Sequence, residues 1–160
     1  SVVEAFDGGE RDPLTVQQIA TLDAGSRLAL QPHLQLVALD YPADDLVLSV
    51  HNRDKRQVSE AGIKYDEVEK GPARLPKLRR HATWLAAHRV DMSVYYLRIR
   101  REEFLTLSAI RQGQPLADAL AAGFAESRIP EVRRAQRVRE WFANWAARGW
   151  ICAPELEILL

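Results

Sequence analysis

Histidines are the first side chains of this sequence that could do chemistry, because imidazole pairs are common metal ligands. The four histidines stand at positions 33, 51, 81 and 88, and no two have the His-x-x-x-His spacing that places two imidazoles on one helix face. His81 and His88 are seven residues apart, which on a single strand puts them on opposite faces. The spacing therefore predicts no metal site in this chain.

Nucleophiles and acid-base pairs are equally weakly indicated. Cys152 is the only cysteine and stands beside Trp150 and Ile151, where a packed, inert thiol is expected. Asp44 and Asp45 closely follow a Tyr-Pro pair, a context typical of a turn with solvated carboxylates. There is no glycine-rich phosphate loop, no Gly-x-Ser-x-Gly motif and no convincing triad. We expect a binding protein without catalytic residues and without a cofactor of its own, rather than an enzyme.

Arginines offer a different chemistry, the recognition of negative charge. Arg133, Arg134, Arg137 and Arg139 stand on one face of a helix predicted to begin near residue 130. They could contact phosphates as a DNA recognition helix does, contact an acidic peptide, or form a solvated face that pairs with neighbouring glutamates. Few amide or hydroxyl side chains accompany them and the region is only moderately basic, which argues against nucleic acid.

The elements that would position these arginines begin with residues 81–120, HATWLAAHRVDMSVYYLRIRREEFLTLSAIRQGQPLADAL. Residues 83–89 and 93–100 are rich in aromatic and branched types, and Asp91 between them tolerates turn geometry, so a hairpin is predicted. The hairpin runs directly into two helices. This order predicts a winged helix-turn-helix within an α+β chain.

The second predicted strand has two different faces. Tyr95, Leu97 and Ile99 would pack, whereas the alternate residues Tyr96, Arg98 and Arg100 would meet solvent or a ligand. If this strand is a sheet edge, an extended peptide can add to it, and its side chains would enter the groove beside the third helix. The predicted edge comprises Ser93, Val94, Tyr95, Tyr96, Leu97, Arg98 and Ile99.

The rest of the chain gives a coarser prediction. Residues 12–22 form a helix that Thr15 caps, residues 24–30 a helix or an extended run, and residues 33–39 a segment too apolar to be exposed. Residues 46–50 are the expected first strand of the sheet, and the charged residues 52–80 a long connection. A helix is expected over residues 102–112, and Gly113 ends it. A second helix begins at Pro115. A third begins near Pro130, and Gly149 ends it. Residues 150–152 form a short extended tail.

These elements divide into a helical segment (1–42), a winged-helix domain (43–152) and a tail (153–160). The 160 residues are 47% apolar, enough for a core, and the single cysteine excludes an internal disulfide. We expect a cytoplasmic protein that does not span a membrane.

The two halves of the chain differ in charge. Residues 1–75 carry 13 acidic and 8 basic side chains, and residues 76–160 carry 9 acidic and 14 basic side chains. Either the basic half has an anionic partner or the two halves attract each other.

Two runs of residues also resemble a known family. ALDYPADDLVLSV (38–50) and ATWLAAHRVDMSVYYLRIRREEFLTLSAIRQGQPLADALAAGF (82–124), with a late Gly149-Trp150, are similar to the HvfC/BufC family, whose members were long labelled DNA-binding proteins. The resemblance covers roughly residues 10–152, and its signatures are apolar and packing-rich rather than catalytic.

The resemblance implies a partner subunit of multinuclear iron-dependent oxidases, which modify precursor peptides in the biosynthesis of ribosomally made, post-translationally modified peptides. Related partner proteins serve the methanobactin and thiaglutamate pathways. The partner resembles a precursor-peptide recognition element with about three strands and three helices, which captures a leader peptide by strand addition. The leader would add along residues 93–99 and lie against Arg133, Arg137, Val138 and Trp141. The iron would belong to the oxidase, and this chain would form a heterodimer with it.

One departure from the family concerns the N-terminus. Typical members begin with a helical domain of their own, which this chain is expected to lack, either as a truncated member or as one of the shorter partner proteins. The acidic stretches 7–12 and 40–45 are then the candidate surface for the oxidase.

Overall fold

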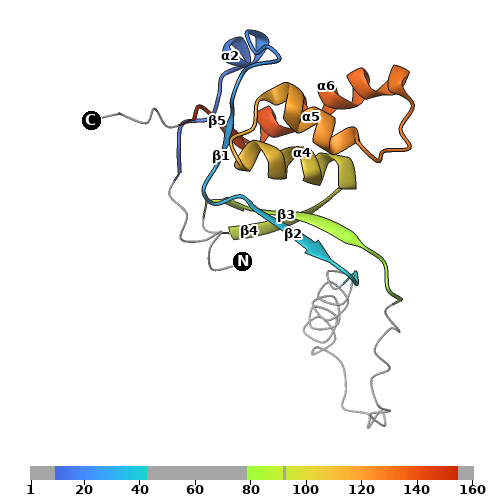
Figure 1. Cartoon of the computed structure of the whole chain (residues 1–160). Coiled ribbons are helices and arrows are strands. Elements are labelled where there is room, and N and C mark those ends of the chain that lie inside the picture. Colours follow the sequence, from blue (N-terminus) through green and yellow to red (C-terminus); the bar gives the residue numbers. More distant parts are fainter. Residues whose placement is uncertain (1–9, 43–78, 92, 155–160) are drawn as a thin grey trace, which may run out of the picture. The chain divides into compact units, whose positions relative to one another are not determined.

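The computed structural model describes residues 10–42, 79–91 and 93–154 (Figure 1). The chain is a mixed α and β protein, as expected. The described elements are, in chain order, α2 (Val16–Ala20), β1 (Ala29–Leu30), β2 (Gln35–Leu39), β3 (Thr83–Val90), β4 (Ser93–Ile99), α4 (Arg101–Arg111), α5 (Leu116–Phe124), α6 (Glu131–Ala147) and β5 (Ile151–Cys152).

The described residues fall into two compact units, one up to Val37 and from Trp84 onward, the other between Ala38 and Thr83. In the second unit the His81 N–H donates to the Asp40 carbonyl at 2.9 Å, and Arg80 lies 3.9 Å from the exposed Asp40 carboxylate. The domain boundaries expected at residues 42 and 152 stay a prediction. The expected strand 46–50, most of the connection 52–80 and the tail from 155 lie outside the described residues.

The hairpin predicted from the sequence is confirmed. β3 and β4 pair antiparallel from Trp84 opposite Ile99 to Val90 opposite Ser93, and Asp91 in the turn has a positive φ of 52°. β2 adds to the other side of β3, so the sheet order is β2-β3-β4. The expectation that His81 and His88 share a strand is wrong, because His81 precedes the first residue of β3.

The helix boundaries follow the signals in the sequence. Thr15 caps α2 in a capping box with Gln18, and Pro115 and Pro130 stand at the N-caps of α5 and α6. Gly113 follows α4 with φ 78°, a left-handed conformation that favours glycine. The predicted helices at these positions are therefore confirmed.

Two short strands join the beginning of the chain to its end. β1 pairs with β5, with Ala29 opposite Cys152 and Leu30 opposite Ile151, which confirms the expected extended tail. The Gln31 N–H also donates to the Trp150 carbonyl at 2.9 Å. Cys152 is buried, as its apolar neighbours predicted.

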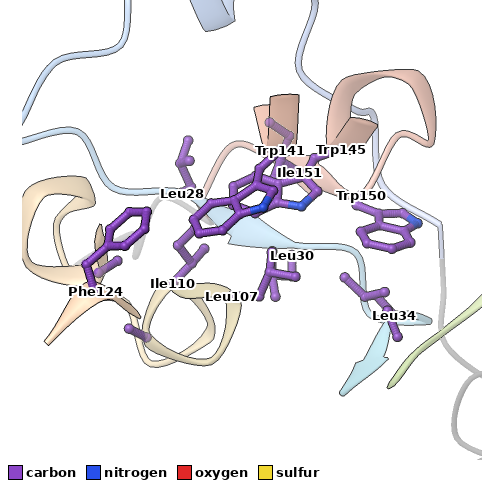
Figure 2. Close-up of a cluster of buried hydrophobic side chains, with 13 residues drawn as sticks. Leu28, Leu30, Leu34, Leu107, Ile110, Phe124, Trp141, Trp145, Trp150 and Ile151 are labelled. Atoms are coloured by element: carbon purple, nitrogen blue, oxygen red, sulfur yellow. The ribbon is translucent and has the colours of Figure 1, made fainter. Parts of the chain in front are cut away.

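The core of the first unit is built on aromatic side chains of α5 and α6 (Figure 2). The Phe124 and Trp141 rings stack with centroids 5.3 Å apart and an interplanar angle of 13°. Trp141 in turn stacks on Trp145 at 6.2 Å. Burial of such large rings is the main favourable term in folding, so these residues anchor α6 against the rest of the unit.

The sheet packs against this core through one face. Leu97 and Ile99 of β4 contact the core cluster, as the alternation predicted. Tyr95 was expected on the packed face too, but its side chain is 52% exposed because it lies near the hairpin turn, opposite His88. On the other face of β3, Leu85 and Ala87 are buried as well. β3 is thus the central strand by burial as well as by order.

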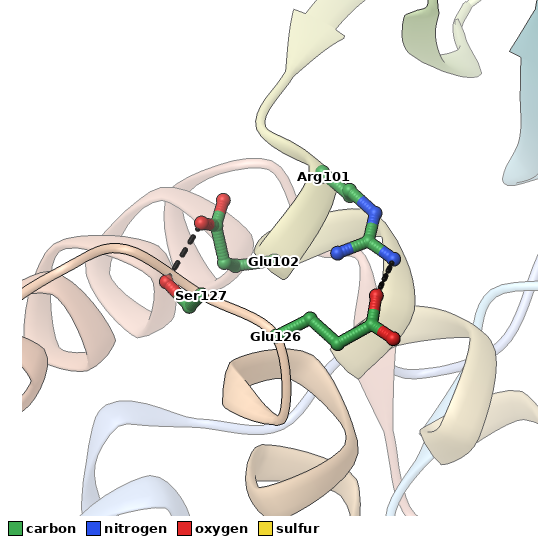
Figure 3. Close-up of polar contacts among 4 residues, drawn as sticks. All are labelled: Arg101, Glu102, Glu126 and Ser127. Carbon is green, nitrogen blue, oxygen red and sulfur yellow. Dashed lines mark hydrogen bonds and ion pairs between the residues drawn. The ribbon is translucent and has the colours of Figure 1, made fainter.

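Polar contacts tie the start of α4 to the loop after α5 (Figure 3). Arg101 lies 2.7 Å from the Glu126 carboxylate, and the Ser127 hydroxyl donates to Glu102 at 2.8 Å. Since α4 begins directly after β4, these contacts help fix the direction in which the hairpin leaves the helical layer.

Candidate functional site

β4 is at the end of the three-stranded sheet, and no strand in the described part of the chain pairs along its outer edge. An edge strand presents backbone N–H and C=O groups that a further strand can bind. Tyr95 and Tyr96 are 52% and 50% exposed there. The predicted binding edge therefore combines main-chain groups with two accessible aromatic rings.

The hairpin register indicates which N–H groups of β4 point outward. Val90 lies opposite Ser93, and across a two-residue loop such a closing pair is normally hydrogen bonded to itself. Because bonded and non-bonded pairs alternate, every second residue from Ser93 directs its N–H toward β3. We infer that the N–H groups of Val94, Tyr96 and Arg98 point to the outer edge.

The predicted contact residues of α6 have different surroundings. Trp141 is 3% exposed and Val138 packs against the core, so both support the helix more than they face solvent. Arg137 donates to Glu140 one turn along α6 at 2.9 Å. Arg133 is exposed.

A depression of about 390 Å³ brings part of the predicted site together. Four of its lining residues were predicted from the sequence: Arg98 and Ile99 of β4, and Arg137 and Trp141 of α6. Four others were not among the predicted site residues: Arg100, Glu103, Glu140 and Asn144. Arg133, Val138 and the β4 residues before Arg98 do not line it. The depression therefore joins the end of β4, the start of α4 and one face of α6.

Glu103 is the most unusual of the residues missed by the sequence. It is 9% exposed, and its carboxylate accepts a hydrogen bond from the Trp145 indole N–H at 2.8 Å. Burial raises the pKa of Glu103, while the Trp145 hydrogen bond and then Arg148, Arg137 and Arg100 oppose that rise. A signal existed, because Glu103 precedes the buried Leu107 and Ile110 by four and seven residues and thus lies on their helix face.

The charges around the depression favour an anion. Three of its lining residues are arginines, Arg98, Arg100 and Arg137, and two are glutamates, Glu103 and Glu140. Both carboxyl groups already accept hydrogen bonds, from Trp145 and Arg137 respectively. The carbonyl of Arg100 accepts from the Phe104 N–H at 2.9 Å, but its guanidinium makes no hydrogen bond or ion pair with another side chain in the described part of the structure. The arrangement can bind a carboxylate or phosphate by charge-assisted hydrogen bonds.

A larger depression of about 630 Å³ lies beside β1 and α4, but its arginines serve the fold. Arg111 donates to the Leu34 carbonyl, and burial lowers its pKa. Arg11 donates to the Ala153 carbonyl at 2.8 Å. These cations therefore hold loops of their own chain.

Within the described ranges no group of three or more His, Cys, Asp or Glu side chains could hold a metal ion. No described helix combines the length and apolar character that crossing a bilayer requires. Comparisons with protein-family models, with curated proteins and with solved structures find no match for this chain.

Proposed function

We propose that this chain is a non-catalytic peptide-recognition subunit. Its winged helix-turn-helix binds the leader of a ribosomally made precursor peptide by strand addition to β4. It then presents the peptide to a multinuclear iron-dependent oxidase, which carries the iron. The oxidase and the precursor enter the proposal from the resemblance of residues 38–50 and 82–124 to the HvfC/BufC family.

The observation that carries the binding mode is the combination of an edge strand with a cationic depression at its end. β4 is the last strand in the described sheet order. Its final residues Arg98 and Ile99, and Arg100 after them, line the depression. A peptide that follows the edge would meet the guanidinium groups as it passes α6. Main-chain pairing would supply affinity, and the depression would supply selectivity.

A backbone substitution tests strand addition directly. Proline at Tyr96 removes an N–H that we infer to point outward, so it should weaken peptide binding while leaving the pairing of β3 with β4 intact. Binders would be selected from a displayed library of random linear peptides against the full chain, and their affinities measured by calorimetry. Tyr96→Pro should lower affinity about tenfold or more, the effect of losing one or two hydrogen bonds at the interface.

The matched control is Tyr96→Ala, which removes the same side chain but keeps the N–H. Circular dichroism of both variants establishes that the fold is retained. If Tyr96→Pro and Tyr96→Ala bind equally well, the peptide does not add to β4 and the proposal is wrong.

The alternative is a winged-helix transcriptional regulator that inserts α6 into the major groove of DNA. Titration with duplex DNA over a series of salt concentrations separates the two functions. DNA binding through the arginines of α6 would lose affinity steeply with salt, because counterions are released. Peptide binding by main-chain pairing should change little with salt.

A further inference from the structure

We propose that the depression between β4, α4 and α6 is a subsite for one acidic side chain of the bound peptide. Arg100 and Arg137 would bind the carboxylate, and the acidic residue would be the one that lies opposite Ile99. This inference rests on the proposed strand addition and specifies the position and the charge that the site selects.

The direction of the incoming side chain follows from strand pairing. Residues directly opposite each other in neighbouring strands direct their side chains to the same face of the sheet. Ile99 directs its side chain to the core face, where it packs against the core cluster, and it also lines the depression. A peptide residue paired with Ile99 would therefore direct its side chain toward the helices and into the depression.

The hydrogen bonds already made in the depression select an anion over a cation. Glu140 accepts from Arg137 at 2.9 Å and from Gln136 at 3.1 Å, and Glu103 accepts from Trp145. Burial also raises the pKa of Glu103, so this carboxyl takes up a proton more readily than an exposed one would. Arg100, by contrast, is an exposed residue whose positive charge acts on Glu103 from outside any ion pair of the described side chains.

Arg137 is already oriented for this task. Its ion pair with Glu140 spans one helical turn, with side chains 35% and 45% exposed, so the guanidinium is held near the depression and still reaches solvent. A guanidinium has five N–H donors, and one partner leaves donors for a second carboxylate. An incoming acid would thus find one oriented and one available guanidinium.

The experiment is a double-mutant cycle between the protein and the selected library peptides. In each peptide the acidic residues are replaced one at a time by their amides, and binding is measured to the parent chain and to Arg100→Ala. One acidic position should lose about tenfold or more in affinity when it is neutralised, the range of a charged hydrogen bond. For Arg100→Ala that loss should shrink strongly, because the partner is already gone.

Arg139→Ala is the matched control, since Arg139 is an exposed arginine of α6 outside the depression. It removes the same charge and should leave the effect of neutralising the peptide unchanged. If Arg100→Ala and Arg139→Ala reduce the loss from neutralising the peptide's acidic residue by the same factor, the effect is general attraction between charges. If the selected peptides that bind contain no acidic residue, the subsite is excluded. If the subsite fails either of these tests but Tyr96→Pro still weakens peptide binding, strand addition to β4 remains supported. If Tyr96→Pro leaves peptide affinity unchanged, strand addition itself is contradicted.

Discussion

Glu103 shows how one residue can be both a structural anchor and a source of pH dependence. Burial raises its pKa above the ordinary value of 4.5, so the folded chain holds this proton at pH values where the unfolded chain has lost it. Stability attributable to Glu103 is therefore greatest at low pH and falls as pH rises from about 4.5 through the higher pKa of the folded state. The ionised carboxylate is destabilising at neutral pH despite its hydrogen bond to Trp145.

Glu103→Gln should consequently stabilise the fold at neutral pH, because the amide oxygen can still accept from Trp145 without a buried charge. Urea denaturation at a series of pH values measures this, and the gain should vanish as the pH falls toward 4.5. Glu103→Leu is the comparison: it leaves the Trp145 N–H without this acceptor and should cost about 1–3 kcal/mol. A gain for Glu103→Gln that is the same at every pH would show that charge is not its cause.

At the scale of elements, the packing of α5 on α4 depends on Gly123. A Cβ at this position would lie 2.7 Å from the Glu102 carbonyl oxygen and would overlap the Thr106 hydroxyl. Alanine is the better helix former by about 1 kcal/mol, but the backbone oxygen of α4 can move only with the helix. We expect Gly123→Ala to destabilise the chain by about 1–3 kcal/mol in chemical denaturation.

The control for this prediction is Ala122→Gly, which changes an exposed position of the same helix. It should cost about 1 kcal/mol through helix propensity alone. If Gly123→Ala is as stable as the parent chain, α5 and α4 do not pack so closely that a Cβ at position 123 lies 2.7 Å from the Glu102 carbonyl oxygen.

Elements with strong local signals were predictable from the sequence. The hairpin follows from alternation around Asp91, and the helices follow from Pro115, Pro130, Gly113 and their apolar spacing. The pairing of β1 with β5 was not predictable, because it joins Leu30 to Ile151 across most of the chain and no local pattern specifies a distant partner. The depression was predicted only in part for the same reason. Arg98 and Arg137 were identified on separate elements. Glu103 was missed although it shares a helix face with Leu107 and Ile110, because a carboxyl side chain is usually exposed.

At the scale of the whole molecule, the buried rings of His88 and Trp150, with the partly exposed ring of Tyr95, join the sheet to the segment after α6. His88 of β3 lies against Trp150 with centroids 5.2 Å apart and against Tyr95 at 6.0 Å. His33 and His88 are 5% and 8% exposed, and the Nδ1 atom of each is buried without a hydrogen-bond partner. Burial is the main cause that lowers the pKa of both residues. The charge of Arg89 lowers the pKa of His33 further, and Glu10 partly opposes this shift. The charges of Arg148 and then His33 lower the pKa of His88 further.

Because both pKa values fall below 6.5, the unfolded chain binds these protons at a higher pH than the folded chain does. Stability from the two histidines is therefore complete above about pH 6.5 and is lost as the pH falls through the lower pKa values of the folded state.

This direction is opposite to that of Glu103, so acidification from pH 6.5 should be tested in the Glu103→Gln background. His88→Phe keeps an aromatic ring against Trp150 but cannot be protonated, and it should flatten the loss of unfolding free energy on acidification. His81→Phe, at an exposed histidine outside the cluster, should follow the parent curve. Parallel curves for His88→Phe and the parent would show that acid destabilises the molecule elsewhere.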